Sequence, residues 1–166
     1  MKIAGASWTF EQNVDTDCIT PGKWLYAPLD EMATHTLEVL DPRFAKEVKP
    51  GEIVVAGRNF GCGSSREQAP RMLKILGVGC VVADSFARIF QRNAIAIGLP
   101  LLPVPGIRAA TQAGDRLEID LASGLVRNQR TGQELRGRPL PARMLEVLLE
   151  GGILPALKRH AATQNS

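Results

Sequence analysis

The sequence contains few of the residues on which metal centres, disulfide frameworks and histidine-based catalysis depend. Its three cysteines, Cys18, Cys62 and Cys80, are odd in number and widely spaced, with no C-x-x-C pair. That pattern argues against a disulfide framework and against a metal cluster held by this chain. The two histidines are His35, which we expect on an exposed helix face, and His160, near the C-terminus. Neither is an obvious general base of the kind that many hydrolases use.

Long apolar runs and a strong charge of one sign are also missing. No apolar stretch approaches the roughly 20 residues of a membrane helix, and residues 1–4 lead into strand-like sequence rather than a signal peptide. Both absences predict a cytoplasmic protein. The formal net charge is only +3, and the single tyrosine stands alone among scattered basic residues. Solvated charge therefore explains the basic residues better than a nucleic-acid surface does.

The remaining pattern is that of one α/β domain spanning residues 1–166, with a frayed tail at 159–166. The elements expected in chain order are a strand at 3–10, a long loop at 13–28, a helix at 29–40, a strand at 52–56, a helix at 69–76, a strand at 80–83, a helix at 86–97, a strand at 99–104, and helices at 140–149 and 153–158. The alternating strands and helices in the middle predict a small, mainly parallel sheet with right-handed crossovers. Residues 116–121 alternate between apolar and polar side chains, and turns at 122–124 and 131–132 separate them from strand-like segments at 125–128 and 134–136. This succession is typical of an antiparallel β-meander.

The most informative stretch is N-F-G-C-G-S-S-R-E-Q at residues 59–68, between a predicted strand and a predicted helix. We expect Ser64 or Ser65 to cap that helix, with Glu67 in its first turn, and Asp84 or Ser85 to cap the helix at 86–97. Free backbone N–H groups at a helix start, together with the charge of Arg66, suit a carboxylate or a phosphate. The stretch is neither a P-loop nor a dinucleotide-binding turn, because the Lys-Ser/Thr pair and the third glycine are missing. Most such turns in α/β proteins bind nothing, so a purely structural turn is the alternative.

The long loop at 13–28 carries two aspartates, two prolines and a glycine. Loops of this length in compact domains are often functional. Asp15 and Asp17 are therefore candidate site residues, although such aspartates more often only shape turns.

Together these segments resemble the small subunits of two-chain hydro-lyases of the aconitase superfamily, the isopropylmalate dehydratase type. The matching segments are V-D-T-D at 14–17, G-E-I-V-V-A-G at 51–57, N-F-G-C-G-S-S-R-E at 59–67, S-F-A-R-I-F at 85–90, R-N-A at 92–94, G-L-P at 98–100 and E-G-G at 150–152. The Gly-x-Gly-Ser-Ser-Arg-Glu element is highly specific, and the resemblance covers nearly the whole chain. It implies a swivel-type α/β domain that is active only as a heterodimer with a large subunit.

The resemblance also implies a mechanism. The large subunit holds a [4Fe–4S] cluster with its own cysteines, this chain binds no metal, and one iron acts as a Lewis acid on a small dicarboxylate substrate. Water is eliminated and then added back across a cis double bond. Ser64 is implied as the base, Asp17 as an orienting or proton-relay residue, and Arg66 and Ser65 as substrate-binding residues. Cys62 occupies a position that varies in the family, so we interpret it as structural.

Substrate choice in this superfamily is set by a loop that matches Lys23, Trp24, Leu25 and Tyr26. Members that act on tricarboxylates place an arginine here, and in homoaconitase-like members it stands at the position of Tyr26. Without it a buried third carboxylate stays unpaired, at a cost of several kcal/mol. We therefore expect 2-isopropylmalate of leucine biosynthesis, with methylmalate, dimethylmalate, maleate and homoaconitate as alternatives. Lys23 would change this expectation if its ammonium group reached the pocket.

One residue departs from the family pattern, because Gln68 stands where histidine is usual. Glutamine keeps hydrogen-bonding capacity but does not titrate near neutrality. If the usual histidine only supports the loop, nothing changes. If its titration adjusts the chemistry of the site, we expect an unusual malate as the substrate. Outside the family, the alternatives are a non-catalytic anion-binding module, nucleic-acid contact through the arginines, and a redox role for Cys62, which needs a depressed thiol pKa. Self-association of the chain alone and its stoichiometry with the large subunit stay open.

Overall fold

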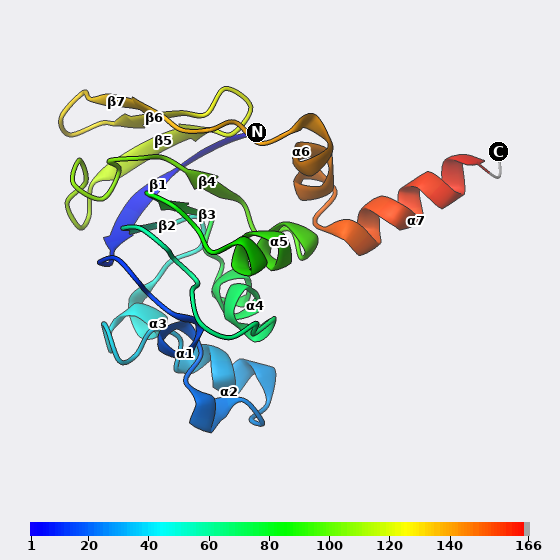
Figure 1. Cartoon of the computed structure of the whole chain (residues 1–166), viewed down its shortest axis with the longest axis horizontal. Coiled ribbons are helices and arrows are strands. Elements are labelled where there is room, and N and C mark those ends of the chain that lie inside the picture. Colours follow the sequence, from blue (N-terminus) through cyan, green and yellow to red (C-terminus); the bar gives the residue numbers. More distant parts are fainter. Residues whose placement is uncertain (165–166) are drawn as a thin grey trace.

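Seven strands form one continuous sheet in the order β4-β3-β2-β1-β5-β6-β7 (Figure 1). The structure is a computed structural model that describes residues 1–164. Its elements are β1 (Lys2–Thr9), α1 (Thr16–Ile19), the 3-10 helix η1 (Gly22–Trp24), α2 (Leu29–Thr34), α3 (Phe44–Glu47), β2 (Ile53–Ala56), α4 (Gln68–Ile75), β3 (Cys80–Ala83), α5 (Arg88–Ala96), β4 (Leu101–Pro103), β5 (Arg116–Asp120), β6 (Leu125–Asn128), β7 (Glu134–Arg136), α6 (Ala142–Leu149) and α7 (Ile153–Gln164).

Strand β1 joins the parallel half of the sheet to the antiparallel half. It pairs in parallel with β2, from Ser7 opposite Ile53, and antiparallel with β5, where Lys2 lies opposite Asp120. Strands β2, β3 and β4 continue the parallel pairing, and β5, β6 and β7 form the meander. The predicted fold class is confirmed, and the structure adds that both halves belong to one sheet.

The central strands β2 and β3 are buried along their whole length, because apolar layers cover both faces of the sheet. Val54 and Val81 contribute to a layer with residues of α4 and α5, whereas Val55 and Val82 contribute to a second layer with residues of α6 and the meander. This explains why both strands are continuous apolar runs in the sequence, while β5 alternates.

Both helix caps predicted from the sequence are wrong. Helix α4 begins at Gln68 with Glu67 in the cap position, so neither Ser64 nor Ser65 caps it. Helix α5 begins at Arg88, and no side chain caps it. Ser85 Oγ instead accepts a hydrogen bond from the backbone N–H of Asn59, at 2.8 Å. These hydroxyl residues belong to loops that contact other loops, and a sequence pattern does not distinguish such contacts from capping.

The long helix predicted at 29–40 is also wrong, because α2 ends at Thr34. Leu37 has a left-handed backbone with φ of +58° and donates its N–H to the carbonyl of Ile19. Burying Leu37 beside α1 therefore stabilises the fold more than extending α2 would. His35, expected on an exposed helix face, is half-buried at the end of α2 and stacks on Trp24 with ring centroids 3.6 Å apart.

Two short helices occupy the segment predicted as a long loop, namely α1 and η1, while α7 is longer than expected. Helix α7 continues past residue 158 because Ala161 and Ala162 favour helix and no glycine or proline follows. Fraying of residues 159–166, and a single domain over 1–166, stay predictions; residues 165–166 lie outside the described part of the chain.

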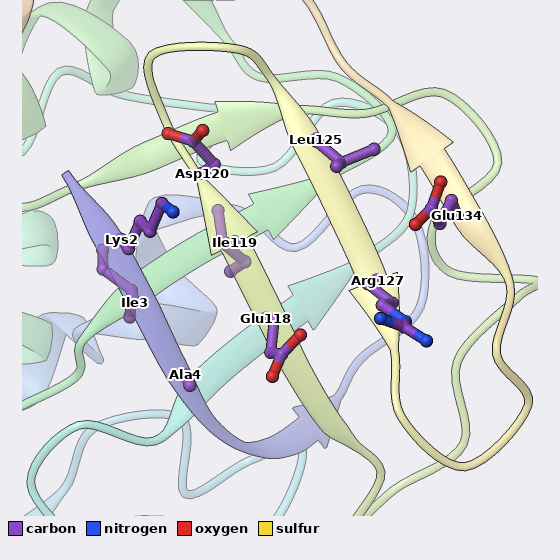
Figure 2. Close-up of a pocket in the computed structure, with 9 residues that line it drawn as sticks. All are labelled: Lys2, Ile3, Ala4, Glu118, Ile119, Asp120, Leu125, Arg127 and Glu134. Carbon is purple, nitrogen blue, oxygen red and sulfur yellow. The ribbon is translucent and has the colours of Figure 1, made fainter.

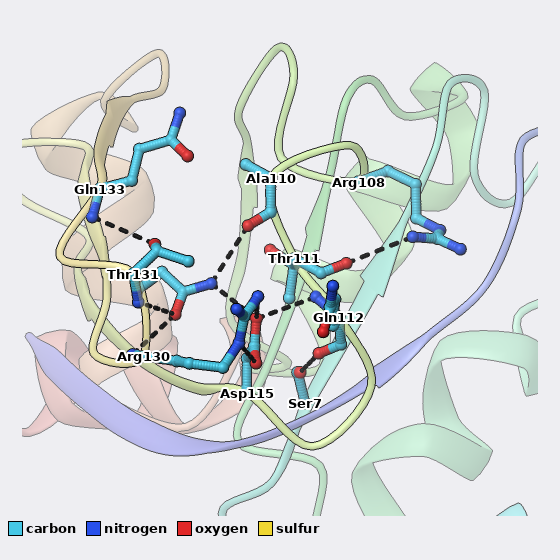
Figure 3. A network of polar contacts seen from close by, with 10 residues as sticks. Ser7, Arg108, Ala110, Thr111, Gln112, Asp115, Arg130, Thr131 and Gln133 are labelled. Atoms are coloured by element: carbon cyan, nitrogen blue, oxygen red, sulfur yellow. Dashed lines mark hydrogen bonds and ion pairs between the residues drawn. The ribbon is translucent and has the colours of Figure 1, made fainter.

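Asp115 is the centre of a buried polar network between the loop before β5 and the turn after β6 (Figure 3). Its side chain is 4% exposed. Its carboxylate accepts hydrogen bonds from Arg130 Nη2 at 3.0 Å, from the backbone N–H of Gln112 at 2.9 Å and from Asn128 Nδ2 at 2.8 Å. The hydrogen bonds from Arg130 hold the pKa of the Asp115 carboxyl well below its usual range.

Replacing Asp115 with alanine is expected to lower the free energy of unfolding at pH 7 by about 1–3 kcal/mol, since it leaves buried donors such as Asn128 Nδ2 without a partner. Because the folded-state pKa is below the unfolded value, the carboxylate contributes stability above about pH 4, which is lost as the pH falls toward the folded-state pKa. Urea unfolding at pH 7 and pH 3 measures this, and the difference from wild type should shrink at pH 3. Asp30→Ala, on the exposed start of α2, is the matched control. Equal stability of Asp115→Ala and wild type at pH 7 would contradict the prediction.

Candidate active site

Three loops lie side by side where β1, β2 and β3 end, because these strands are parallel neighbours. The first loop bonds to the second through Gly61 N–H to the carbonyl of Val14, at 2.7 Å, and Thr16 N–H to the carbonyl of Cys62, at 2.8 Å. The second loop bonds to the third through Phe60 N–H to the carbonyl of Ser85, at 3.1 Å. The carboxyl edge of parallel strands is where α/β proteins commonly bind ligands.

The turn that presents Ser64 depends on its two glycines. Gly61 and Gly63 have φ of +81° and +93°, and a Cβ on Gly61 would lie 2.2 Å from the ring of Phe90. Thr16 is buried and donates its hydroxyl to the carbonyl of Ser64, at 2.9 Å. The turn is therefore fixed against α1 and α5, while Ser64 and Ser65 remain exposed.

Arg66 links this turn to the first loop. Its Nη1 donates to Asp17 Oδ1 at 2.7 Å and to the carbonyl of Thr20 at 2.9 Å. The Arg66 hydrogen bond holds the pKa of the Asp17 carboxyl below its usual range, and the backbone N–H of Gly22 adds to this at 3.0 Å. Within residues 1–164 no hydrogen bond occupies Arg66 Nε or Nη2. Asp17 is thus an ionised group that orients the guanidinium, and one edge of that guanidinium is available.

Ser64 and Arg66 line a cavity of about 210 Å³ between this turn and the start of α5. The other lining residues are Thr16, Gly61, Gly63, Ala87, Arg88, Ile89, Phe90 and Asn93. The sequence interpretation assigned no site role to Thr16, Arg88 or Asn93. The sequence could have indicated Arg88 and Asn93, because both follow β3, the strand next to β2, and so lie at the same edge of the sheet. No ion pair involves Arg88 among residues 1–164.

The segment predicted to set substrate choice begins at this site but does not line the cavity. A Cβ on Gly22 would lie 3.3 Å from Asp17 Oδ1. Lys23 Nζ is 3.7 Å from Glu38 Oε1, so the ammonium group is paired on this surface. Trp24 and Leu25 are half-buried, and Tyr26 is fully exposed. The substrate-binding roles of these four residues and of Ser65 stay predictions.

The cysteines of this chain form neither a reactive thiol nor a metal site among residues 1–164. Burial raises the pKa of the Cys62 thiol and, more strongly, that of Cys80, which argues against a reactive thiolate. Among residues 1–164 no three His, Cys, Asp or Glu side chains gather as metal ligands. The described residues of this chain therefore do not fit an iron–sulfur cluster.

Two further regions lie apart from this cavity. Gln68 begins α4 and lines a neighbouring groove instead of the cavity.

A hollow of about 440 Å³ lies over β1 and the meander (Figure 2) and contains none of the predicted site residues. Its lining includes Glu118, Arg127 and Glu134, which lie on one face of the antiparallel strands. Mixed charges of this kind are usual for a solvated sheet face.

A model of the Aconitase C-terminal domain family matches residues 9–105, a range that includes all three loops. The chain belongs to this family. It is 50% identical over 161 residues to the isopropylmalate/citramalate isomerase small subunit of Methanocaldococcus jannaschii, with 96% of each chain covered. It is 51% identical over 153 residues to the methanogen homoaconitase small subunit of Methanothermobacter thermautotrophicus, with 92% of this chain and 88% of the relative covered.

A solved structure is similar to the whole chain. The crystal structure of 3-isopropylmalate dehydratase (LeuD) from Methanocaldococcus jannaschii superimposes with a TM-score of 0.93 at 38% identity, covering 99% of this chain and 98% of that one. The predicted family is confirmed, and its small subunits function with a large subunit.

Within the described residues, no helix is long and apolar enough to cross a membrane.

Proposed function

We propose that this chain is the small subunit of a heteromeric hydro-lyase that converts 2-isopropylmalate to 3-isopropylmalate in leucine biosynthesis, in the cytoplasm. The observation that carries the proposal is the pairing of an exposed Ser64 with the Asp17-oriented Arg66 at one cavity. Near-full-length relatives named as 3-isopropylmalate dehydratase small subunits, such as that of Methanopyrus kandleri at 49% identity over 158 residues, support it.

Ser64 is proposed as the base that removes the proton next to a substrate carboxylate. A serine hydroxyl is a weak base unless its alkoxide is stabilised. Arg66 and Arg88 line the same cavity as Ser64, and their positive charges are proposed to stabilise that alkoxide. Fixed charges in a site shielded from water stabilise a developing anion far better than water does. Closure of the cavity by the large subunit would supply that shielding.

Arg66 is proposed to bind one substrate carboxylate through the edge formed by Nε and Nη2. Asp17 and the carbonyl of Thr20 hold Nη1 and so fix the plane of the guanidinium. A guanidinium held in this way matches a carboxylate bidentately. Arg88, on the other wall of the cavity, is the matching cation for the second carboxylate of a malate.

The large subunit is proposed to hold the [4Fe–4S] cluster, which supplies Lewis-acid chemistry toward the substrate hydroxyl. The residues of this chain would bind the carboxylates, orient the reacting carbon toward Ser64 and accept its proton. The small subunit contributes the carboxylate-binding and proton-transfer half of the site.

The substrate is proposed to lack a third carboxylate. Tyr26 is fully exposed at the position where homoaconitase-like members have arginine, and Lys23 is paired with Glu38. Neither therefore offers a cation to a tricarboxylate. Citramalate is the second candidate, because a relative at 50% identity is named as an isopropylmalate/citramalate isomerase small subunit.

Reconstitution with the large subunit from the same organism tests this proposal. Under anaerobic conditions, we expect kcat/KM for 2-isopropylmalate to exceed that for homocitrate by about 100-fold or more, since an unpaired carboxylate costs several kcal/mol. Isomerisation of 2-isopropylmalate, citramalate and homocitrate is measured under the same conditions. Each subunit alone serves as the control and should be inactive. Comparable turnover of homocitrate, or activity of this chain alone, would contradict the proposal.

A further inference from the structure

Helix α7 extends away from the rest of the chain (Figure 1), and it exposes large apolar side chains. Leu154 is 68% exposed and Leu157 is 58% exposed. Ile75 on α4 and Ile89 on α5 are about half exposed as well. A helix that projects with exposed leucines has an apolar face that the rest of this chain does not cover.

A groove of about 650 Å³ connects the base of α7 with the segment that carries Ser64. One side is formed by Arg71 and Ile75 on successive turns of α4, and the other by Ile97 at the end of α5 and by Leu154. Glu67 and Gln68 line the same groove and directly follow Arg66, which lines the catalytic cavity.

Helix α5 connects the two hollows. Ile89 and Asn93 line the catalytic cavity, whereas Ala96 and Ile97 line the groove. Position 93 is four residues after 89, and positions 96 and 97 are three and four residues after 93, so all four lie on one helical face. The cavity and the groove are therefore consecutive parts of one surface, which ends at the exposed side chains of α7.

The base of α7 is held firmly although most of the helix is exposed. A Cβ on Gly98 would lie 2.4 Å from the carbonyl carbon of Gly151, so the backbone after α5 packs directly on the turn before α7. Lys74 donates hydrogen bonds to the carbonyls of Ile97 and Gly151. These contacts fix the direction in which α7 leaves the domain, which reduces the ordering cost when a partner binds it.

We infer that the large subunit docks on the surface formed by Arg71, Ile75, Ile89 and Leu154, which Leu157 extends by one turn of α7. This is called the α4–α5–α7 surface. The inference rests on the proposed function, because Ser64 and Arg66 act only on a substrate that the other subunit also holds. That subunit must cover the catalytic cavity, and the α4–α5–α7 surface continues from it. A second copy of this chain seated there would cover Ser64 and block the site. Arg71 is exposed and has no ion pair among residues 1–164, so the partner should place an acidic side chain opposite it.

The test is the affinity of the double variant Leu154→Asp/Leu157→Asp for the large subunit, measured by sedimentation velocity. Because both side chains are exposed, the fold and the unfolding midpoint should match those of wild type. We expect the Kd to rise about 30-fold or more, as for loss of two apolar anchors at an interface, and kcat at saturating small subunit to stay unchanged. Val39→Asp, at a side chain 65% exposed outside this surface, is the matched control and should bind normally.

A second variant tests the charge. Arg71→Glu should weaken binding at low salt and lose most of that effect at high salt, because the contribution is electrostatic. Wild-type affinity of both variants would overturn the inference. It would also be overturned if the aspartates only dissociated a homodimer of this chain. Binding is measured without activity, so a complex that forms normally but turns over no malate contradicts the proposed function and leaves the docking surface standing.

Discussion

Replacing Ser64 with alanine is expected to lower kcat of the reconstituted enzyme about 1,000-fold, because a positioned general base typically contributes 10²- to 10⁴-fold. The side chain is exposed, and its only side-chain neighbour at hydrogen-bond distance within residues 1–164 is Thr16 Oγ1, at 3.4 Å. The fold and the affinity for the large subunit should therefore persist. Steady-state isomerisation of 2-isopropylmalate and the KM of the variant measure the effect.

Ser65→Ala is the matched comparison, since it removes the neighbouring exposed hydroxyl. Ser65 does not line the cavity, so a loss below about tenfold is expected for a single neutral hydrogen bond. If Ser64→Ala keeps wild-type kcat, another group is the base. If both variants lose activity equally, the turn as a whole matters rather than the Ser64 hydroxyl.

Replacing Arg66 with lysine is expected to lower kcat/KM about 100-fold, mainly through a higher KM. Lysine keeps the positive charge but lacks the planar fork that binds a carboxylate bidentately. It also cannot hold Asp17 and the carbonyl of Thr20 through one nitrogen while offering a second edge to the substrate. The same anaerobic isomerisation assay, over a range of 2-isopropylmalate concentrations, separates KM from kcat.

Arg127→Lys provides the control for Arg66→Lys. Arg127 is exposed on β6 in the hollow over the meander (Figure 2), outside the cavity that Ser64 and Arg66 line, and should tolerate the change. A normal KM for Arg66→Lys would show that the guanidinium does not bind a substrate carboxylate. A large loss in both variants would indicate a general effect of replacing arginine.

The order of apolar and polar residues was sufficient to predict those strands in which buried positions are either continuous or alternate regularly. Strand β3, at Cys80–Ala83, has the predicted bounds, and β2 differs by one residue, because both faces of these strands are covered and the whole run is apolar. The alternation of β5 likewise predicted the meander. The pattern of hydroxyl residues before a helix failed at Ser64 and Ser85, neither of which caps a helix. The Ser64 carbonyl accepts a hydrogen bond from the Thr16 hydroxyl, and the Ser85 hydroxyl accepts one from the backbone N–H of Asn59.

The site was predictable in composition and not in geometry. The Ser64–Arg66 element and Asp17 are evident in the sequence, but their contact joins residues 49 positions apart. That contact exists because β1 and β2 are parallel neighbours whose following loops emerge together. Arg88 reaches the same cavity for the same reason, one strand further along.

The amino-acid sequence by itself determined the family, the α/β class, the buried central strands and the small set of residues that carry the proposed chemistry. Only the tertiary structure decided that the meander extends the parallel sheet through β1, that Leu37 ends α2, that Asp17 orients Arg66, and that α7 projects with its leucines exposed. The features that the sequence determined follow from the spacing of apolar side chains and from backbone preferences over a few residues. The features that the tertiary structure decided depend on free energies of burial and pairing between segments far apart in the chain, which neighbouring residues do not encode.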